Sequence, residues 1–164
     1  MSNNPQVILK DRYQVVPRTL ILVFQNDKVL LQKGAPTKKI WAGYYNGLGG
    51  HIERGEDALS AARRELMEEA GLECLDLHLC GTVMIDVEEH NGITLFVMTG
   101  NQIKGTINES DEGSLHWVKI EDLAALKVVE DIPEIVERIL TEKQAIFHAH
   151  YGYDESGKRI TTLG

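Results

Sequence analysis

Residues 50–72 read GHIERGEDALSAARRELMEEAGL, and the interpretation of the whole chain starts from this stretch. The spacing predicts a helix over 57–70, because Asp57 can cap the first turn and Gly71 stands just past the last periodic residue, where helices commonly end. One side of this helix is apolar, which suits packing against a sheet. The members of that stripe are Leu59, Ala62, Leu66 and Ala70.

Three carboxylates share one face of the predicted helix. Glu65, Glu68 and Glu69 are spaced i, i+3 and i+4, so their side chains are neighbours. Like charges at these spacings cost about 0.2–0.5 kcal/mol per pair, and Arg63 and Arg64 offset only part of this repulsion. A divalent cation would explain the cluster, and hard oxygen ligands select Mg²⁺, Mn²⁺ or Ca²⁺ over softer metals. The alternative is an ordinary acidic surface helix.

The same stretch fits the pattern G-x5-E-x7-R-E-U-x-E-E-x-G-U, where U is aliphatic, at every defined position. In this it resembles the Nudix box. The resemblance implies an α/β fold, namely the Nudix-type α/β/α sandwich with a mixed β-sheet between helices. It also implies a hydrolase that cleaves a nucleoside diphosphate linked to another group, with Mg²⁺ as cofactor and Mn²⁺ as a second option.

The resemblance assigns roles to individual residues. Glu65, Glu68 and Glu69 match the catalytic box positions that ligate Mg²⁺, one of which helps to activate water. Gly49 matches a glycine whose carbonyl is a metal ligand in the MutT-like branch. Arg64 matches an arginine that pairs with a box glutamate. The residues with supporting roles are Gly50, Glu56 and Arg64.

The similarity continues outside the box. Residues 46–50, NGLGG, are similar to the lead-in of MutT-like and oxidised-purine nucleoside triphosphatases, in which the residue matching Asn46 contacts the base. Residues 109–112, ESDE, resemble a loop of the latter enzymes whose last glutamate reaches the metal, so Glu112 is either a metal ligand or a solvated loop acid. Asp131 falls near their base-reading acids, but the aromatic residue that precedes such an acid is absent here.

A basic, aromatic and glycine-containing loop over 33–45 precedes the box. Such a loop can receive phosphates or a base, which makes Lys33 a candidate for substrate binding together with Asn46 and Asp131. A plain surface loop with a partly buried Trp41 is the alternative.

Together these features predict a Mg²⁺-dependent pyrophosphohydrolase with a small-molecule nucleotide as substrate. Within that class, a MutT-like (d)NTP diphosphatase of the 8-oxo-dGTP type, which releases NMP and pyrophosphate, is the leading hypothesis. Nucleotide sugars, ADP-ribose and dinucleoside polyphosphates stay open as substrates. Two non-catalytic hypotheses also stay open, a nucleotide sensor built on the Nudix fold and a structural acidic domain.

Composition narrows the class of protein. A chain of 164 residues predicts one domain over 1–164. The formal net charge of −8 disfavours a protein that coats nucleic acid. No apolar run approaches the roughly 20 residues of a membrane helix, and the N-terminus lacks a signal pattern, so we expect no membrane contact and a cytoplasmic location. Cys74 and Cys80 fit neither a disulfide framework nor a zinc motif.

Local patterns place the other elements. We expect strands over 19–24, 28–32, 75–87, 93–99 and 115–118, a hairpin turn at Asn91-Gly92, and a polar loop over 100–114. A short helix is expected over 120–126 and a longer one over 133–143, capped by Asp131. The tail over 145–164 predicts a C-terminal β-hairpin extension. His148 and His150 share a face there, and the alternating Phe147, Tyr151 and Tyr153 suit a sheet edge or a homodimer contact.

Overall fold

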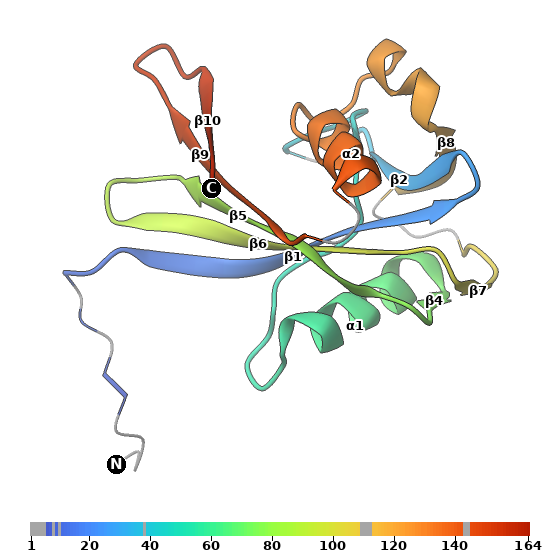
Figure 1. The fold of residues 1–164 in the computed structure, drawn as a ribbon, viewed down its shortest axis with the longest axis horizontal. Helices are drawn as coiled ribbons and strands as arrows, with labels where there is room; N and C mark the ends of the chain where they lie inside the picture. The colour runs from blue at the N-terminus through green and yellow to red at the C-terminus, as the bar shows by residue number, and fades with distance from the viewer. Residues whose placement is uncertain (1–5, 8, 10, 38, 109–112, 143–144) are drawn as a thin grey trace.

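The computed structural model describes residues 6–7, 9, 11–37, 39–108, 113–142 and 145–164, and its centre is a mixed sheet between two helices (Figure 1). The strand order is β10-β9-β5-β6-β1-β2-β3, and β8 pairs with β2. Strands β4 and β7 form a separate two-stranded sheet. The elements are β1 (Gln14–Gln25), β2 (Lys28–Gly34), β3 (Tyr45–Asn46), α1 (Ala58–Ala70), β4 (Leu72–Cys74), β5 (His78–Asp86), β6 (Asn91–Gly100), β7 (Ile103–Gly105), β8 (Gly113–Lys119), the 3-10 helix η1 (Ile120–Ala125), α2 (Ile132–Thr141), β9 (Phe147–Tyr153) and β10 (Arg159–Leu163).

Strand β1 shows why the sheet is covered on both faces. Successive side chains of a strand point to opposite faces, and here both sets are apolar. Leu20, Leu22 and Phe24 join the core cluster that contains α2. Ile21 and Val23 join the cluster that contains α1. The α/β sandwich expected from the sequence is therefore confirmed, with α1 and α2 on opposite faces of the sheet (Figure 1).

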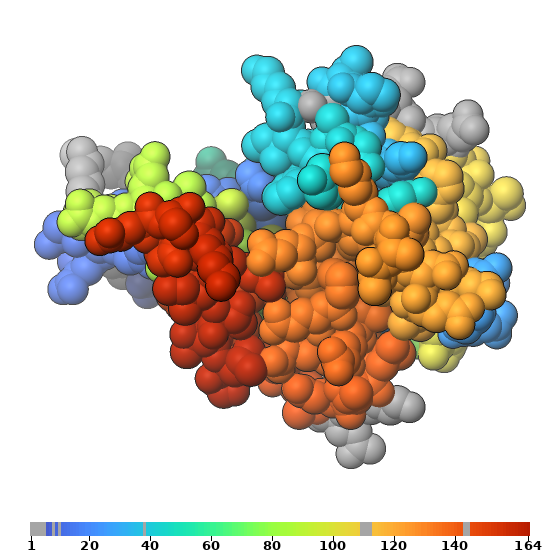
Figure 2. Space-filling view, turned by 90° about the horizontal axis from the view of Figure 1, so that it is seen from above, coloured from blue at the N-terminus to red at the C-terminus, as the bar shows by residue number. Residues whose placement is uncertain are grey.

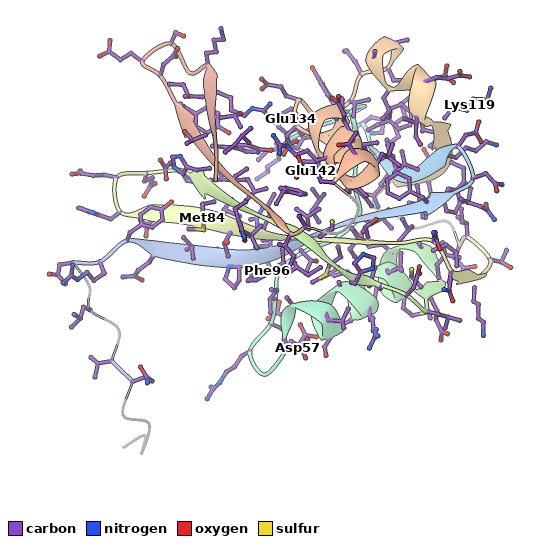
Figure 3. The ribbon with its side chains drawn as sticks, viewed as in Figure 1. Asp57, Met84, Phe96, Lys119, Glu134 and Glu142 are labelled. Atoms are coloured by element: carbon purple, nitrogen blue, oxygen red, sulfur yellow. The ribbon has the colours of Figure 1, made fainter. Side chains whose placement is uncertain are left out.

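Helix α1 begins and ends where the sequence predicts. The Asp57 carboxylate accepts hydrogen bonds from the Leu59 and Ser60 backbone N–H groups, each at 2.9 Å, and caps the first turn (Figure 3). Gly71 has φ 68°, the left-handed conformation that commonly ends a helix. Ala62, Leu66 and Ala70 are buried against the sheet, and Glu65 and Glu69 lie beside this stripe, at the Gly49-Gly50 turn.

Helix α2 lies on the other face, with Ile132, Ile135 and Val136 buried. The prediction that Asp131 caps this helix is wrong. Its side chain makes no capping hydrogen bond, because its backbone has φ −88° and ψ −18° instead of the extended conformation of a capping residue. The Asp131 carboxyl is therefore available for another role.

The C-terminal hairpin extends the large sheet. Strand β9 pairs in parallel with β5, and β10 pairs antiparallel with β9 at the sheet edge. The Asp154 carboxylate accepts hydrogen bonds from the backbone N–H groups of Ser156 and Lys158, which holds the turn between the two strands. Phe147 and Tyr151 are buried within this chain, so the interpretation of these two rings as a homodimer contact is corrected.

Two local expectations also differ from the structure. The chain reverses between β5 and β6 over residues 87–90, and Gly92 already lies inside β6, paired with Asp86. The segment over 100–114 was expected to be a polar loop but includes β7, which pairs with β4. Both differences arise from strand pairing, which a local turn pattern does not report. In the described part of the chain, no helix is both long and apolar enough to cross a membrane.

Candidate active site

A cleft of about 1010 Å³ brings the box residues together with segments distant in sequence. One end is lined by the Gly49-Gly50 turn and by Glu65 and Glu69 of α1. Asn46 lies along its length. The other end is lined by residues 129–131, which lead into α2, and by the C-terminal hairpin. We call the part lined by Glu65 and Glu69 the acidic end; the second end mixes apolar side chains with Glu130, Asp131 and Arg159.

The acidic end depends on a glycine turn. Gly49 has φ 126°, and a Cβ at this position would overlap the Thr19 carbonyl oxygen of β1. The Gly49 N–H donates to Glu69 Oε2 at 2.8 Å, and the Thr19 N–H donates to Gly50 O at 2.8 Å. This turn is thus fixed to the sheet on one side and to Glu69, whose side chain is buried, on the other.

Gly50 is required by the adjacent carboxylate. A Cβ at this position would lie 2.5 Å from Glu65 Oε1 and 2.7 Å from its Cδ. The Glu65 carboxylate therefore sits directly against the backbone, and a side chain at position 50 would displace it. Glu65 and Glu69 approach the same turn from one face of α1, as their spacing predicts.

Arg64 joins three of the four box glutamates. Its Nε and Nη2 lie 2.7 and 3.0 Å from the two oxygens of Glu56, a bidentate pair. Its Nη1 donates to Glu65 Oε1 at 2.8 Å and to Glu68 Oε2 at 3.1 Å, and Nη2 also donates to the His51 carbonyl at 3.1 Å. These hydrogen bonds raise the pKa of Arg64, and those from Arg64 lower the pKa of Glu56 to about 2.

Glu56→Gln is expected to destabilise the fold above pH about 4.5 but not below pH about 2. The pKa of Glu56 falls from an ordinary 4.5 to about 2 in the folded protein, so the ionised carboxylate stabilises the fold above the unfolded value. This contribution is lost as the pH falls through the folded value. Urea unfolding of both proteins across this range measures the difference, and Glu73→Gln, an exposed change on β4, is the control. A difference that is constant with pH would contradict the assignment.

The donor set at the acidic end fits a hard divalent cation. Glu65 and Glu69 line this end, and Arg64 joins Glu65 to Glu56 and Glu68 beside it. Carboxylate oxygens are the ligands that such cations prefer. Within the described ranges, no three His, Cys, Asp or Glu side chains are already arranged around a metal position. Glu68 is 60% exposed and does not line the cleft.

Of the remaining residues predicted for the site, some line the cleft and others do not. Asn46 lines the cleft, and its Oδ1 accepts a hydrogen bond from the Gly47 N–H at 2.8 Å. Asp131 also lines the cleft, and burial raises the pKa of its carboxyl. Lys33 is not brought to the cleft, since its Nζ lies 5.6 Å from the centre of the Tyr45 ring. Glu112 lies outside the described residues.

The hairpin supplies cleft residues that the sequence did not point to. Tyr151, Tyr153 and Arg159 line the second end. The alternation of the tail predicted a hairpin, but no local pattern told which sheet edge it would join. Arg159 carries no motif signal, and only the pairing of β9 with β5 brings it to the cleft.

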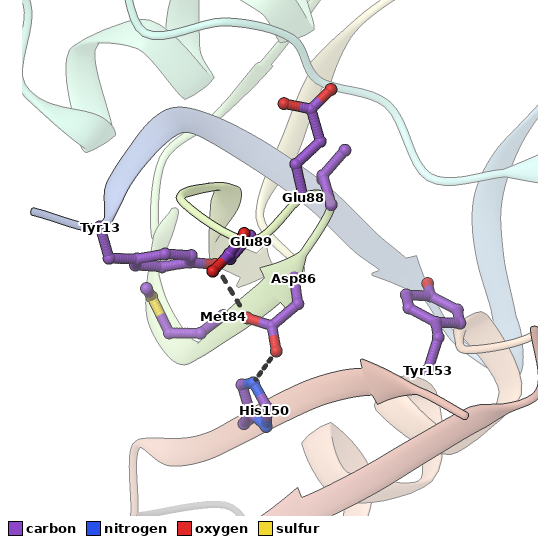
Figure 4. Close-up of a pocket in the computed structure, with 8 residues that line it drawn as sticks. Tyr13, Met84, Asp86, Glu88, Glu89, His150 and Tyr153 are labelled. Atoms are coloured by element: carbon purple, nitrogen blue, oxygen red, sulfur yellow. Dashed lines mark hydrogen bonds and ion pairs between the residues drawn. The ribbon is translucent and has the colours of Figure 1, made fainter. Parts of the chain in front are cut away.

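A second, more open cavity of about 670 Å³ lies beside the hairpin (Figure 4). In it Asp86 accepts a hydrogen bond from the Tyr13 hydroxyl at 2.9 Å, and its other oxygen lies 2.9 Å from His150 Nε2. His148 instead lies with Nδ1 2.8 Å from the Thr82 hydroxyl. The two histidines thus each contact β5, and these contacts tie β9 to its neighbour.

Comparisons with known proteins find relatives of this chain in sequence and in fold. The model of the NUDIX domain family matches residues 15–139. Two relatives named oxidized purine nucleoside triphosphate hydrolase, from Mus musculus and Danio rerio, are 33% and 36% identical over 106 residues, which is 64% of this chain and 67% of each relative. The crystal structure of a mutator MutT protein from Bacillus halodurans superposes with a TM-score of 0.78 at 22% identity, over 91% of this chain and 97% of that one.

Proposed function

Because the chain belongs to the NUDIX domain family and is a hydrolase of pyrophosphate bonds, we propose that it cleaves nucleoside triphosphates to NMP and pyrophosphate with Mg²⁺ as cofactor. The observation that carries the proposal is the cleft itself. Its acidic end, with Glu65 and Glu69 against the Gly49-Gly50 turn, belongs to the same cleft as the second end, and the whole volume of about 1010 Å³ suits a small-molecule substrate. An oxidised purine is the leading base, since the two relatives carry that name.

The phosphate end provides charge and alignment. Glu65 and Glu69, which line the cleft, would hold the cation with the Gly49 carbonyl as a backbone ligand. Glu68 would join them from beside the cleft, where Arg64 links it to Glu65. Mg²⁺, when bound there, neutralises phosphate charge and lowers the pKa of water. The chain's own part is to keep the carboxylates in place: the Gly49 N–H holds Glu69, and Arg64 holds Glu65 and Glu68. A carboxylate that is not consumed as a ligand can accept the proton of the attacking water.

The nucleoside end provides orientation. Leu20, Leu95 and Val129 give it an apolar surface on which a flat base can lie. Asn46 and Asp131 stand at this surface and can hydrogen bond the edge of the base. Burial raises the pKa of Asp131, which favours its protonated, hydrogen-bond-donating form more than in an exposed aspartate.

A substrate panel tests the proposal. Normal and oxidised nucleoside triphosphates, nucleotide sugars, ADP-ribose and dinucleoside polyphosphates are incubated with the enzyme and Mg²⁺, and pyrophosphate and phosphate release are measured. We expect pyrophosphate from triphosphates, with oxidised purines preferred. Release of NMP from a nucleotide sugar or dinucleotide alone would reassign the substrate. Nucleotide binding without hydrolysis of any member would favour a sensor.

The protein is expected to stay folded when divalent metal is removed. Two buried apolar clusters, one on each face of the sheet, hold the fold, and neither includes the carboxylates that face the cleft. Circular dichroism during titration with EDTA should therefore show unchanged secondary structure while activity disappears. A cooperative loss of ellipticity with chelator would contradict the expectation and show that the cation is part of the fold.

A further inference from the structure

The C-terminal hairpin lies outside the segment that the family model matches, yet it forms one wall of the cleft. It contributes Tyr151 and Tyr153 from β9 and Arg159 from β10. Figure 2 shows the hairpin, in red, beside the orange segment that includes α2. The second end of the cleft is thus built from two parts of the chain that must be held against each other.

Arg159 makes that connection. Its Nη2 donates to Glu134 Oε2 at 3.2 Å, and its Nε lies 3.8 Å from Glu130 Oε1. The guanidinium carbon lies 4.6 Å from the centre of the Tyr151 ring. The Arg159 side chain is only 12% exposed. Glu134 extends from α2 (Figure 3), so this one guanidinium contacts both walls. Planar guanidinium groups suit such combined ion-pair and stacking contacts.

We propose that Arg159 is a positioning residue for substrate: it fastens the C-terminal hairpin to the start of α2 and so holds Tyr153 and Asp131 as the wall that receives the nucleobase. The inference rests on the proposed function, because it takes a nucleotide as the occupant of the cleft. The role of Arg159 does not depend on the metal end of the cleft, since none of its described contacts involves Glu65, Glu68 or Glu69.

The charges around Asp131 support this arrangement. Burial raises the pKa of Asp131 most, Glu130 and Glu134 raise it further, and Arg159 lowers it. Loss of the guanidinium would remove the cation that lowers the pKa of Asp131, while Glu134 would keep its 3.7 Å ion pair with Arg138 of α2. The pKa of Asp131 would then rise further, which gives a signal that loss of packing alone would not give.

Arg159→Met tests the proposal because it keeps the unbranched stem of the side chain and removes the charged guanidinium. With a nucleoside triphosphate as substrate, we expect KM to rise about tenfold and kcat to stay within about twofold, since only binding of the nucleoside is weakened. The midpoint of the change in KM with pH should move to higher pH. Lys158→Met is the matched control, because it removes an exposed cation from the adjacent position, and it should behave as wild type.

Arg159→Lys separates charge from geometry. It should keep the wild-type pH midpoint, because the charge is retained, and raise KM severalfold, because an ammonium cannot contact both walls as the planar group does. If circular dichroism shows that Arg159→Met is unfolded at the assay temperature, the KM and the pH midpoint of Arg159→Lys test the proposal instead. Two results would overturn the proposal. The first is a folded Arg159→Met with the wild-type KM and pH midpoint. The second is an unfolded Arg159→Met together with a wild-type KM in Arg159→Lys.

Equilibrium binding distinguishes this inference from the proposed function. Calorimetry with a purine nucleoside monophosphate measures binding without turnover in wild type, Arg159→Met and Lys158→Met. Wild-type binding that weakens about tenfold only in Arg159→Met supports the inference even if no triphosphate is hydrolysed. Hydrolysis with equal binding by all three proteins overturns the inference and leaves the function standing. No binding and no hydrolysis by wild type overturns both.

Discussion

Glu69→Gln is expected to lower kcat for pyrophosphate release by at least about 100-fold, the loss typical of removing one charge-stabilising group from an active site. Glu69 is buried, it accepts the Gly49 N–H at 2.8 Å, and it lines the acidic end of the cleft. Glutamine keeps the shape and an oxygen acceptor, so the turn should remain in place while the negative charge is lost. The concentration of Mg²⁺ needed for half-maximal activity should also rise.

Glu73→Gln is the matched control for this change. Glu73 is exposed on β4, shortly after α1, and does not line the cleft. The control should keep wild-type kcat and the wild-type response to Mg²⁺. Full activity of Glu69→Gln would remove the main support for a cation held by the face of α1. Loss of activity with a lowered melting temperature would instead assign Glu69 a structural role.

Gly49→Ala is expected to reduce the free energy of unfolding by about 3 kcal/mol and to reduce kcat more than tenfold. Gly49 has φ 126°, which side-chain-bearing residues rarely adopt, and the added Cβ would overlap the Thr19 carbonyl oxygen. Because that oxygen belongs to β1, relief requires the turn to move. The movement would carry the Gly49 N–H away from Glu69 and displace the metal end of the cleft.

Gly55→Ala is the control that separates the strain of a positive φ from the overlap with the Thr19 carbonyl oxygen. Gly55 has φ 92°, and a Cβ there would meet nothing within 4 Å. Its cost should be about 1–2 kcal/mol, with activity retained. Urea unfolding and pyrophosphate release measure both variants. Equal destabilisation by the two changes would mean that the contact with Thr19 does not constrain the turn.

The sequence predicted best the part of the site that lies within one short stretch. Helix α1, the Asp57 cap and the left-handed Gly71 are local features, and each follows from the residues that form it. The shared face of Glu65 and Glu69 follows from the helical repeat. The sequence did not predict that Arg64 contacts Glu56, Glu65 and Glu68 at once, since two of these partners are not at the i, i+4 spacing.

The nucleoside end could not be predicted in the same way. It is formed by strands and loops that meet only after the sheet is assembled, so no periodicity reports it. Asp131 was expected to cap α2, yet its backbone conformation excludes this and its carboxyl faces the cleft. Lys33 fitted the composition of a basic loop, but the pleat of β2 directs it toward Tyr45. The role of Arg159 depends on the register of the C-terminal hairpin.

The parallel pairing of β9 with β5 has a consequence for the order of folding. Thr82 and His148, partners in this pairing, are 66 positions apart, so closing the loop between them costs more entropy than forming the local hairpins of the sheet. The parallel pairing of β1 with β6 closes an even longer loop, since its partners Val16 and Ile93 are 77 positions apart. We therefore expect the antiparallel pairs β1–β2 and β5–β6 to form before both parallel pairings. Refolding followed by stopped flow should show the formation of strand structure before the recovery of nucleotide affinity.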